Sequence, residues 1–340
     1  MIKIKNILTS IIILVSTIVA NTATDISFLD LPVNSRSASL GNTFLSDIGN
    51  PSNLLLNPSN IWFGDRVNSN KKWNIFPRFS YSGYDNKLYD YDNIASSFQF
   101  GNGLTVGLGM IQTSQGDIYH YDSNANYLGE IKHTQSAFLF GGAFKIAGIN
   151  FGMSGAYVQT DFSDLENYGE QDDILVTSIG LSMNNKSINI DKGNLWIEIL
   201  IPDDISLHFL SRNVISDIST EVAISRNSFY RNIIGVRLDN NVDTEYINIP
   251  IYFLLDYKSN NSFTNNSIDW GLGSDIINNS NFGLSFNIGA KNIWEVGFFN
   301  EFSFGFDVTF GDTIFGFTSL KNPWGGDTYI GSLTYSFDKR

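Results

Sequence analysis

Three histidines and one serine motif are the candidate catalytic groups in this sequence. His120, His133 and His208 lie far apart and do not show the spacing of metal ligands. Residues 152–156 read Gly-Met-Ser-Gly-Ala. This stretch begins like the G-x-S-x-G turn that presents a nucleophilic serine in hydrolases, but alanine stands where the last glycine is needed. The sequence therefore offers no nucleophile with a partner at a recognisable spacing.

Two further stretches could bind a cofactor or a metal ion. Residues 101–103 open like a dinucleotide-binding loop, but Val106 stands where the third glycine is needed. Asp90 and Asp92 alternate with tyrosines in residues 84–93, and Ca²⁺ prefers carboxylate oxygens. That stretch lacks the glycine and the closing glutamate of a calcium loop, which favours a solvated loop with interfacial tyrosines. We expect no catalytic residue, no cofactor, no metal site and no enzymatic activity.

The elements that carry these residues are strands. From about residue 73 onward, apolar and polar residues alternate, which is the pattern of a half-buried strand. Clear runs cover residues 73–81, 104–110, 138–146, 149–157, 175–183, 195–201, 247–255, 282–288, 302–310 and 329–337. Stretches rich in Asn, Asp, Ser and Gly separate the runs, and residues 84–93, 114–127 and 161–173 are the long ones. We expect these three stretches to be loops.

The residues that alternate with the apolar ones in each run form the second face of the strand, and they distinguish a membrane barrel from a soluble sandwich. Between the phenylalanines of residues 302–310 stand serine, glycine, aspartate and threonine. An apolar face toward lipid and a small, polar face toward a lumen are typical of an outer-membrane barrel. Many runs also reach the 9–11 residues that a tilted strand needs to cross a bilayer. The sequence thus predicts an all-β fold, a transmembrane antiparallel barrel of about fourteen strands over residues 66–340.

Composition agrees with this fold class and excludes others. Charged residues make up 16% of the chain and aromatic residues 14%, whereas soluble domains carry about 25% charged residues. The formal net charge of −13 argues against nucleic acid as a partner, because phosphate binding needs a basic surface. The chain has no cysteine, which removes thiol catalysis and cysteine-type metal sites.

The N-terminus has two expected parts. Lys3 and Lys5 precede an uncharged, isoleucine-rich stretch of the kind found in secretory signal peptides, and small residues follow. We expect residues 1–20 to be cleaved as a signal peptide; an N-terminal membrane anchor is the alternative, but the stretch is shorter than the ~20 residues that a spanning helix needs. Residues 24–65 lack alternation and predict a plug segment with short helices at residues 40–48 and 53–56.

This segment also carries a family resemblance. Residues 34–44 read Asn-Ser-Arg-Ser-Ala-Ser-Leu-Gly-Asn-Thr-Phe and resemble the opening G-A-R-A-x-A-L-G-G-A-F of the PorV/PorQ family, part of the wider group of FadL-like barrels. Residues 57–61, Asn-Pro-Ser-Asn-Ile, look like that family's N-P-A-G-L. The resemblance assigns Arg36, Ala38, Gly41, Asn57, Pro58 and Asn60 to the plug motif. Asn42 departs from a usual glycine, and Ser59-Asn60 replaces Ala-Gly.

The resemblance implies a barrel of about fourteen strands whose N-terminal segment folds inward as a plug. It implies a non-enzymatic accessory of type IX protein secretion at the outer membrane, with outer-membrane lipid and secreted cargo or secretion components as partners. The alternative is a FadL-like transporter of hydrophobic small molecules, which needs an apolar lumen pocket and a gap in the wall. The mostly small and polar inner faces of the runs favour the accessory. Arg36 is expected to pair with lumen carboxylates, because an unpaired charge inside a barrel is costly.

Overall fold

The computed structural model describes most of the chain, in segments. These are residues 27–44, 48–62, 75–85, 89–101, 103–121, 127–163, 173–187, 202–216, 232–243, 248–259, 266–278, 282–291, 301–322 and 326–337. The expected signal peptide at residues 1–20 and the expected strand at residues 195–201 lie outside these segments.

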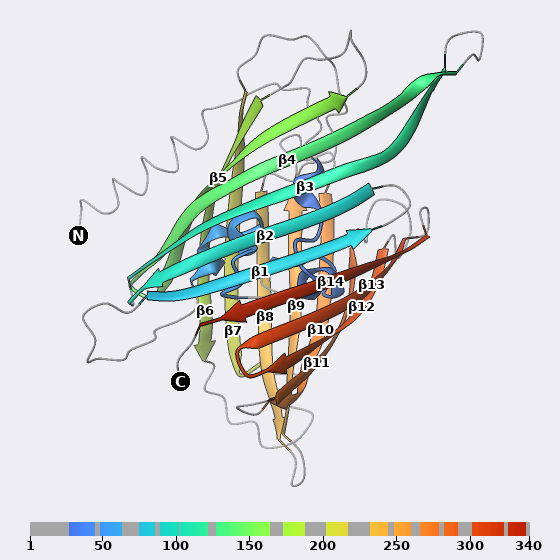
Figure 1. Ribbon diagram of the computed structural model, residues 1–340. Coiled ribbons are helices and arrows are strands. Elements are labelled where there is room, and N and C mark those ends of the chain that lie inside the picture. Colours follow the sequence, from blue (N-terminus) through green and yellow to red (C-terminus); the bar gives the residue numbers. More distant parts are fainter. Residues whose placement is uncertain are drawn as a thin grey trace.

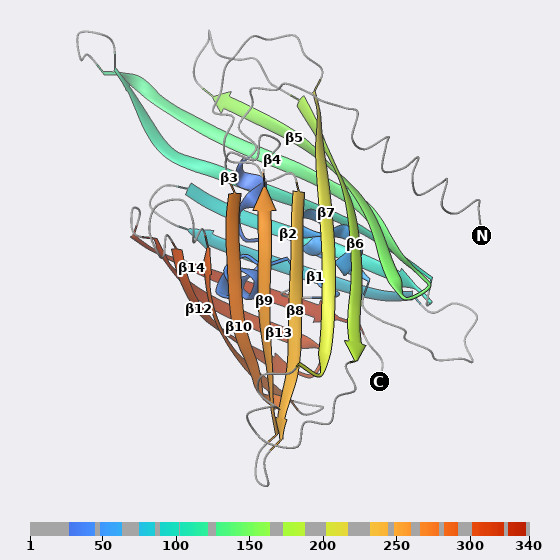
Figure 2. The ribbon, with the colours of Figure 1, turned by 180° about the vertical axis from the view of Figure 1, so that it is seen from behind.

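Fourteen antiparallel strands form one closed barrel in which every strand pairs with its neighbours in the sequence and β1 pairs with β14 (Figures 1 and 2). The strands are β1 (Ile75–Asp85), β2 (Tyr89–Phe100), β3 (Leu104–Tyr121), β4 (Tyr127–Ile146), β5 (Ile149–Ser163), β6 (Asp173–Ser187), β7 (Asp204–Ser216), β8 (Asn232–Asp243), β9 (Asn248–Ser259), β10 (Asn266–Asn278), β11 (Phe282–Lys291), β12 (Glu301–Phe310), β13 (Thr313–Asn322) and β14 (Gly326–Ser336). The predicted transmembrane barrel of fourteen strands is confirmed.

Alternation explains why these residues form a closed wall. Large apolar side chains point outward and stay exposed, as in Leu108 (60%) and Phe304 (46%), whereas their neighbours point inward and are buried. Closing the sheet leaves no open edge, so the backbone N–H and C=O groups within the wall find partners on neighbouring strands, which a bilayer demands because it offers no water. Among the described residues, no helix is both long and apolar enough to cross a membrane.

The two ends of the barrel differ in their connections. One end has tight turns, such as Ala147-Gly148 between β4 and β5, where both residues have positive φ angles of 51° and 84° as a two-residue hairpin of type I′ requires. At the other end β3 and β4 extend as a long hairpin beyond the rim (Figure 1). The loops expected at residues 84–93 and 114–127 are therefore mostly strand. The loops were predicted because these residues are polar. The hydrogen bonds between strands are made by the backbone, so the strands continue beyond the apolar belt whatever the side chains are.

The segment between residues 27 and 62 lies inside the barrel. It contains a 3₁₀ turn η1 (Ser27–Asp30), helix α2 (Ser35–Ser39), helix α3 (Asn53–Leu56) and a 3₁₀ turn η2 (Pro58–Ile61). Helix α3 lies where the sequence predicted it. The helix expected at residues 40–48 is wrong in its described part, because Gly41 and Asn42 adopt left-handed φ angles of 70° and 61° that end α2.

The inner face differs between the two sides of the barrel. On β11 and β12 the buried inward residues are small or polar, such as Ser285, Asn287 and Ser303. On β3 to β8 buried polar residues such as Gln135, Asn150 and His208 stand beside apolar ones. The apolar ones join the leucines of the inner segment in one cluster, with members Ile111, Ala137, Leu139, Val158, Ile174, Val176, Leu210 and Ile233. The expectation of a mostly small and polar inner face thus did not include this apolar cluster.

Candidate functional site

Arg36 links α2 to residues of β9, β10 and β12 on the barrel wall. Its guanidinium donates to the hydroxyl of Tyr252 at 2.8 Å and lies 3.4 Å from a carboxylate oxygen of Asp275 and 3.6 Å from one of Asp307. The charge is thus paired with two lumen carboxylates, as the sequence required. The Tyr252 hydroxyl donates a hydrogen bond to the side-chain oxygen of Asn287 at 2.6 Å, so the network extends across β9 to β12.

Ala38 and Gly41 allow the same segment to approach the wall closely. Ala38 is 1% exposed on α2, where any larger side chain would meet the surrounding core. A Cβ atom on Gly41 would lie 2.5 Å from the backbone oxygen of Trp270 and 2.6 Å from that of Ala290. Glycine is therefore required at position 41 by space as well as by its positive φ.

Asn57, Pro58 and Asn60 build the second half of the inner segment. Asn57 ends α3 and caps η2, because its side-chain oxygen accepts from the backbone N–H of Ser59 at 3.1 Å. Pro58 occupies the first position of η2, where its missing N–H is not needed. Asn60 donates from its side-chain amide to the backbone oxygen of Phe44 at 3.0 Å. These three residues lie against β4 to β6, away from Arg36, so the motif residues do not form one site.

Phe44 lies between the part of the inner segment that contains α2 and the part that contains α3 and η2. It contacts charged groups that the sequence did not single out. Its backbone N–H donates to Asp256 at 2.7 Å, and its ring lies 4.6 Å from the Lys258 ammonium and 5.4 Å from the Arg212 guanidinium. The ring of His208 stacks beside it, 6.4 Å between centroids. His208 is 3% exposed and faces the lumen.

Two buried ion pairs complete this attachment. Arg212 pairs with Asp30 at 2.6 Å and donates to the backbone oxygen of Leu55 at 3.0 Å, so one side chain holds both halves of the segment. Lys258 pairs with Asp269 at 2.5 Å and donates to the backbone oxygen of Asn42 at 2.8 Å. Among the residues that the structure describes, no group of three His, Cys, Asp or Glu side chains could hold a metal ion.

The inner segment spans the lumen from wall to wall. Helix α2 lies against β11 to β14, whereas α3 and η2 lie against β3 to β6 on the opposite side of the closed sheet. Figures 1 and 2 show the helical turns enclosed by strands in both views. A solute that moves along the barrel axis would have to displace this segment, and with it the ion pair of Arg212 with Asp30 and the hydrogen bond from Lys258 to Asn42.

The seam between β1 and β14 carries small residues at its centre. Gly83 pairs with Gly331 and the adjacent Ser82 pairs with Ser332, so four neighbouring positions carry nothing larger than serine. A Cβ atom on Gly331 would have no atom within 4 Å. Ser82 donates to the backbone oxygen of Val33, and the Ser332 hydroxyl lies 2.5 Å from that of Ser35, so the inner segment backs this part of the wall.

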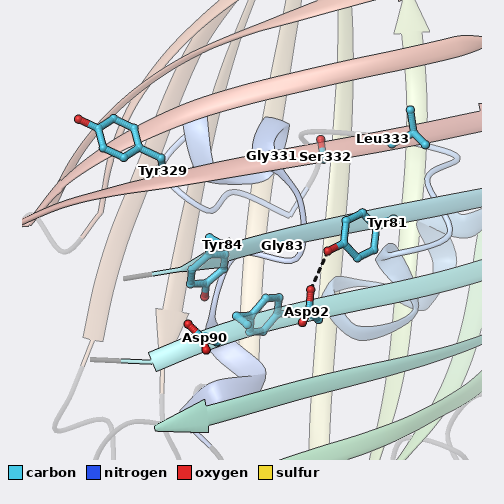
Figure 3. Close-up of a pocket in the computed structure, with 10 residues that line it drawn as sticks. Tyr81, Gly83, Tyr84, Asp90, Asp92, Tyr329, Gly331, Ser332 and Leu333 are labelled. Atoms are coloured by element: carbon cyan, nitrogen blue, oxygen red, sulfur yellow. Dashed lines mark hydrogen bonds between the residues drawn. The ribbon is translucent and has the colours of Figure 1, made fainter. Parts of the chain in front are cut away.

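A hollow of about 730 Å³ lies over this seam (Figure 3). Its lining comes from three strands: Tyr81, Gly83 and Tyr84 of β1, Asp90, Tyr91 and Asp92 of β2, and Tyr329, Gly331, Ser332 and Leu333 of β14. Tyr81 and Tyr329 are about half exposed, at 46% and 53%, on the outer face. The hydroxyl of Tyr81 donates to Asp92 at 2.8 Å, drawn as a dashed line in Figure 3.

Tyr84 and Tyr91 belong to both the hollow and the apolar core of the lumen. They face each other across β1 and β2, and their rings stack at 4.7 Å with an interplanar angle of 13°. Both are buried, at 7% and 1% exposed. This ring pair therefore stands between the apolar lining and the outer hollow.

Sequence reasoning missed this seam. The stretch of residues 84–93 attracted attention as a loop and a weak calcium candidate, but Asp90 and Asp92 lie on β2 with their side chains outside the barrel. The pairing of Gly83 with Gly331 joins the first strand to the last, and no local pattern signals it. The available signal was the concentration of tyrosines between two alternating runs.

Comparisons with known proteins support the fold and leave the family open. No family model matches the chain, and no curated protein matches its sequence. Among solved structures, the toluene transporter TbuX of Ralstonia pickettii is similar with a TM-score of 0.53 at 9% identity, covering 91% of this chain and 99% of that one. The monoaromatic hydrocarbon channel CymD gives a TM-score of 0.51 at 9% identity, covering 90% and 97%. This chain shares the fold of these channels.

Proposed function

We propose that this protein is an outer-membrane channel that passes small apolar molecules between its lumen and the bilayer through the β1–β14 seam. The observation that carries the proposal is the buried apolar cluster that β3 to β8 form with the leucines of the inner segment, which reaches the hollow through Tyr84 and Tyr91. An apolar solute gains free energy against such side chains, at about 25 cal/mol per Å² of surface removed from water. The cluster supports the first requirement of a transporter, which is apolar side chains on the lumen side of the wall.

The second requirement is a way through the wall. Movement along the axis is opposed by a segment held through the buried pair of Arg212 with Asp30, whose disruption leaves charges unpaired. Movement through the seam requires β1 and β14 to separate where Ser82 and Gly83 face Ser332 and Gly331, between the larger pairs Tyr81–Leu333 and Tyr84–Ile330. TbuX is described as a toluene transporter and CymD as a monoaromatic hydrocarbon channel, and their shared fold makes this class of solute the natural first choice.

A disulfide across the seam tests the proposal. The chain has no cysteine, so Gly83→Cys with Gly331→Cys introduces one defined pair at directly opposed positions. Opposed residues of antiparallel strands have Cα atoms about 4.5–5.5 Å apart, within the range that a disulfide bridges. The variant would be expressed in a deletion strain. The cells would also contain an excess of an intracellular ring oxygenase, which consumes the toluene that enters. We expect toluene consumption to fall to the level of the empty strain when the pair is oxidised, and to recover with a reductant.

The control places the same bond elsewhere in the wall. Phe304 and Ser319 are opposed on β12 and β13 and face outward, so Phe304→Cys with Ser319→Cys closes a different seam. Oxidation of this pair should leave consumption unchanged. Equal consumption by oxidised and reduced Gly83/Gly331 cells would remove the seam route, and equal consumption with and without the protein would remove the transport function.

A second candidate is the non-enzymatic accessory of protein secretion that the N-terminal resemblance implies. The firm attachment of the inner segment favours it, because Arg36, Asn57 and Asn60 of the motif are all engaged in holding that segment. Its partners would be outer-membrane lipid and secreted cargo or secretion components. Comparison of secreted proteins between parent and deletion strains tests it: accumulation of exported proteins in the periplasm supports this candidate, and unchanged export contradicts it.

A further inference from the structure

The inner segment determines where a solute in the seam could reach the lumen. Ser82 donates to the backbone oxygen of Val33, and the hydroxyl of Ser332 lies 2.5 Å from that of Ser35. The inner segment therefore covers the lumen side of the wall at the centre of the seam. The next inward side chain of β1 belongs to Tyr84, which also lines the hollow (Figure 3). A solute that enters from the hollow thus meets Tyr84 before it meets the rest of the apolar cluster.

Tyr84 stands in a row of three buried side chains that crosses the seam. Tyr91 of β2 opposes it on one side, and Ile330 of β14 opposes it on the other. The exposed fractions are 7% for Tyr84, 1% for Tyr91 and 0% for Ile330, and all three belong to the apolar cluster. Separation of β1 from β14 would part Tyr84 from Ile330 and leave the two tyrosines together on β1 and β2.

The two tyrosine rings form an aromatic surface at this point of the wall. Their centroids lie 4.7 Å apart and their planes differ by 13°, so one face of the Tyr84 ring lies on Tyr91. Because β1 lies between β2 and β14, the side of Tyr84 away from Tyr91 is directed toward β14. A flat ring that takes the place of Ile330 there would extend the stack, since aromatic rings prefer offset-stacked or edge-to-face contacts.

The other two tyrosines of the hollow have partners on the outer face. Tyr81 donates to Asp92 at 2.8 Å, and Tyr329 stacks on Phe317 with 6.0 Å between the ring centroids. Both rings would contact a solute in the hollow, before it enters the seam.

Burial alone does not select an aromatic solute. Its free energy follows the apolar area removed from water, so methylcyclohexane, which has the carbon skeleton of toluene, gains at least as much from the cluster as toluene does. A contact between two aromatic rings adds an attraction that a saturated ring lacks. One such contact corresponds to about a two- to tenfold difference in affinity.

We infer that Tyr84 is the residue that makes the seam select aromatic over saturated rings. Tyr84 contacts the solute, and Tyr91 is a positioning residue that holds the Tyr84 ring through the stack. The inference rests on the proposed transport function, because it assigns a specificity-determining residue to the same seam.

Toluene and methylcyclohexane are the probes, because they share a carbon skeleton and differ in aromaticity. Cells of the deletion strain would contain an excess of an intracellular monooxygenase that oxidises both, and they would consume the two solutes from an equimolar mixture. The rates of cells without the protein are subtracted. The ratio of toluene to methylcyclohexane consumption is then compared between variants, so that the preference of the oxygenase cancels.

Tyr84→Leu removes the ring and keeps an apolar side chain. We expect it to lower the ratio about threefold or more while methylcyclohexane consumption is retained. Tyr84→Phe keeps the ring and should keep the ratio. Tyr91→Leu is a second variant, which should also lower the ratio because the Tyr84 ring loses its support. Phe304→Leu is the matched control, since it removes an outward ring of β12, away from the seam, and should leave the ratio unchanged.

Compact migration before boiling on a detergent gel shows that each variant has folded. An unchanged ratio in Tyr84→Leu and Tyr91→Leu would overturn the inference, while consumption that depends on the protein would still support transport. An equal loss in Tyr84→Phe and Tyr84→Leu would overturn it as well, because the hydroxyl and not the ring would then be selective. If both solutes are consumed at the same rate with and without the protein, the transport function fails, and the inference fails with it.

Discussion

At the scale of single residues, the barrel interior contains charged side chains that are buried together with their partners. Arg212 has a side chain that is fully buried, and it pairs with Asp30 of the inner segment. We predict that Arg212→Met loosens the inner segment by about 3–5 kcal/mol, because the carboxylate of Asp30 then stays buried without its partner. Limited proteolysis should cut the variant between residues 27 and 62 under conditions in which the unmodified protein resists.

The partner substitution distinguishes the lost pair from lost packing. In the double variant Arg212→Met with Asp30→Leu, no charge is left behind, and apolar replacement of a buried pair is often neutral. Protease resistance should return toward that of the unmodified protein. A double variant as sensitive as Arg212→Met alone would show that the contact of Arg212 with Leu55 or Phe44, and not the ion pair, holds the segment.

The substitution of glycine by alanine is expected to have different effects at two glycines of the wall. A Cβ atom on Gly152 would overlap the backbone of Pro58 and Ser59, whereas one on Gly331 would meet open space. We predict that Gly152→Ala displaces η2 and costs about 1–3 kcal/mol, the usual penalty of overpacking. Gly331→Ala should leave stability unchanged. Urea unfolding of the two variants, followed by tryptophan fluorescence, measures the difference, and equal midpoints would contradict the close packing of η2 on β5.

At the scale of elements, α2 is too short to be stable alone and depends on its cap and its contacts. Asn34 caps it, accepting from the backbone N–H of Ser37 at 2.7 Å. We predict that Asn34→Ala weakens the inner segment by about 1 kcal/mol, whereas Asn34→Ser retains most of the stability. The proteolysis rate between residues 27 and 62 is the measurement, and equal rates for the two variants would show that wall contacts alone hold α2.

The strands were more predictable than the inner segment, and the reason is physical. Lipid outside and a filled lumen inside impose a period of two on every strand, so alternation predicts runs such as residues 302–310, now β12. Helix α2 has no such period, and its end depends on Asn42, which holds a left-handed φ of 61° while its side chain donates to the backbone oxygen of Asp30. That contact exists only once the segment has folded, so the sequence could not place it.

At the scale of the whole molecule, the closure of the barrel brings together residues whose proximity cannot be inferred from the sequence. The sequence predicts the number of strands, but the hollow exists because β1 meets β14, which brings Tyr81 beside Leu333 from opposite ends of the chain. The pairing of Arg36 with lumen carboxylates was expected from the cost of a buried charge. Its two partners on β10 and β12 could be named only from the closed barrel.

The wall and the inner segment should be separable, because all fourteen strand pairings run between neighbouring strands and none depends on residues 27–62. We predict that a variant lacking residues 27–62 still folds into a compact barrel, with water replacing the segment around Arg212 and Lys258. In planar lipid bilayers the unmodified protein should then show no steady ion conductance, whereas the deletion variant should conduct, since the described residues 27–44 and 48–62 lie inside the lumen. Stable conductance of the unmodified protein would mean that the segment leaves an axial path open, and apolar solutes would then not need the seam.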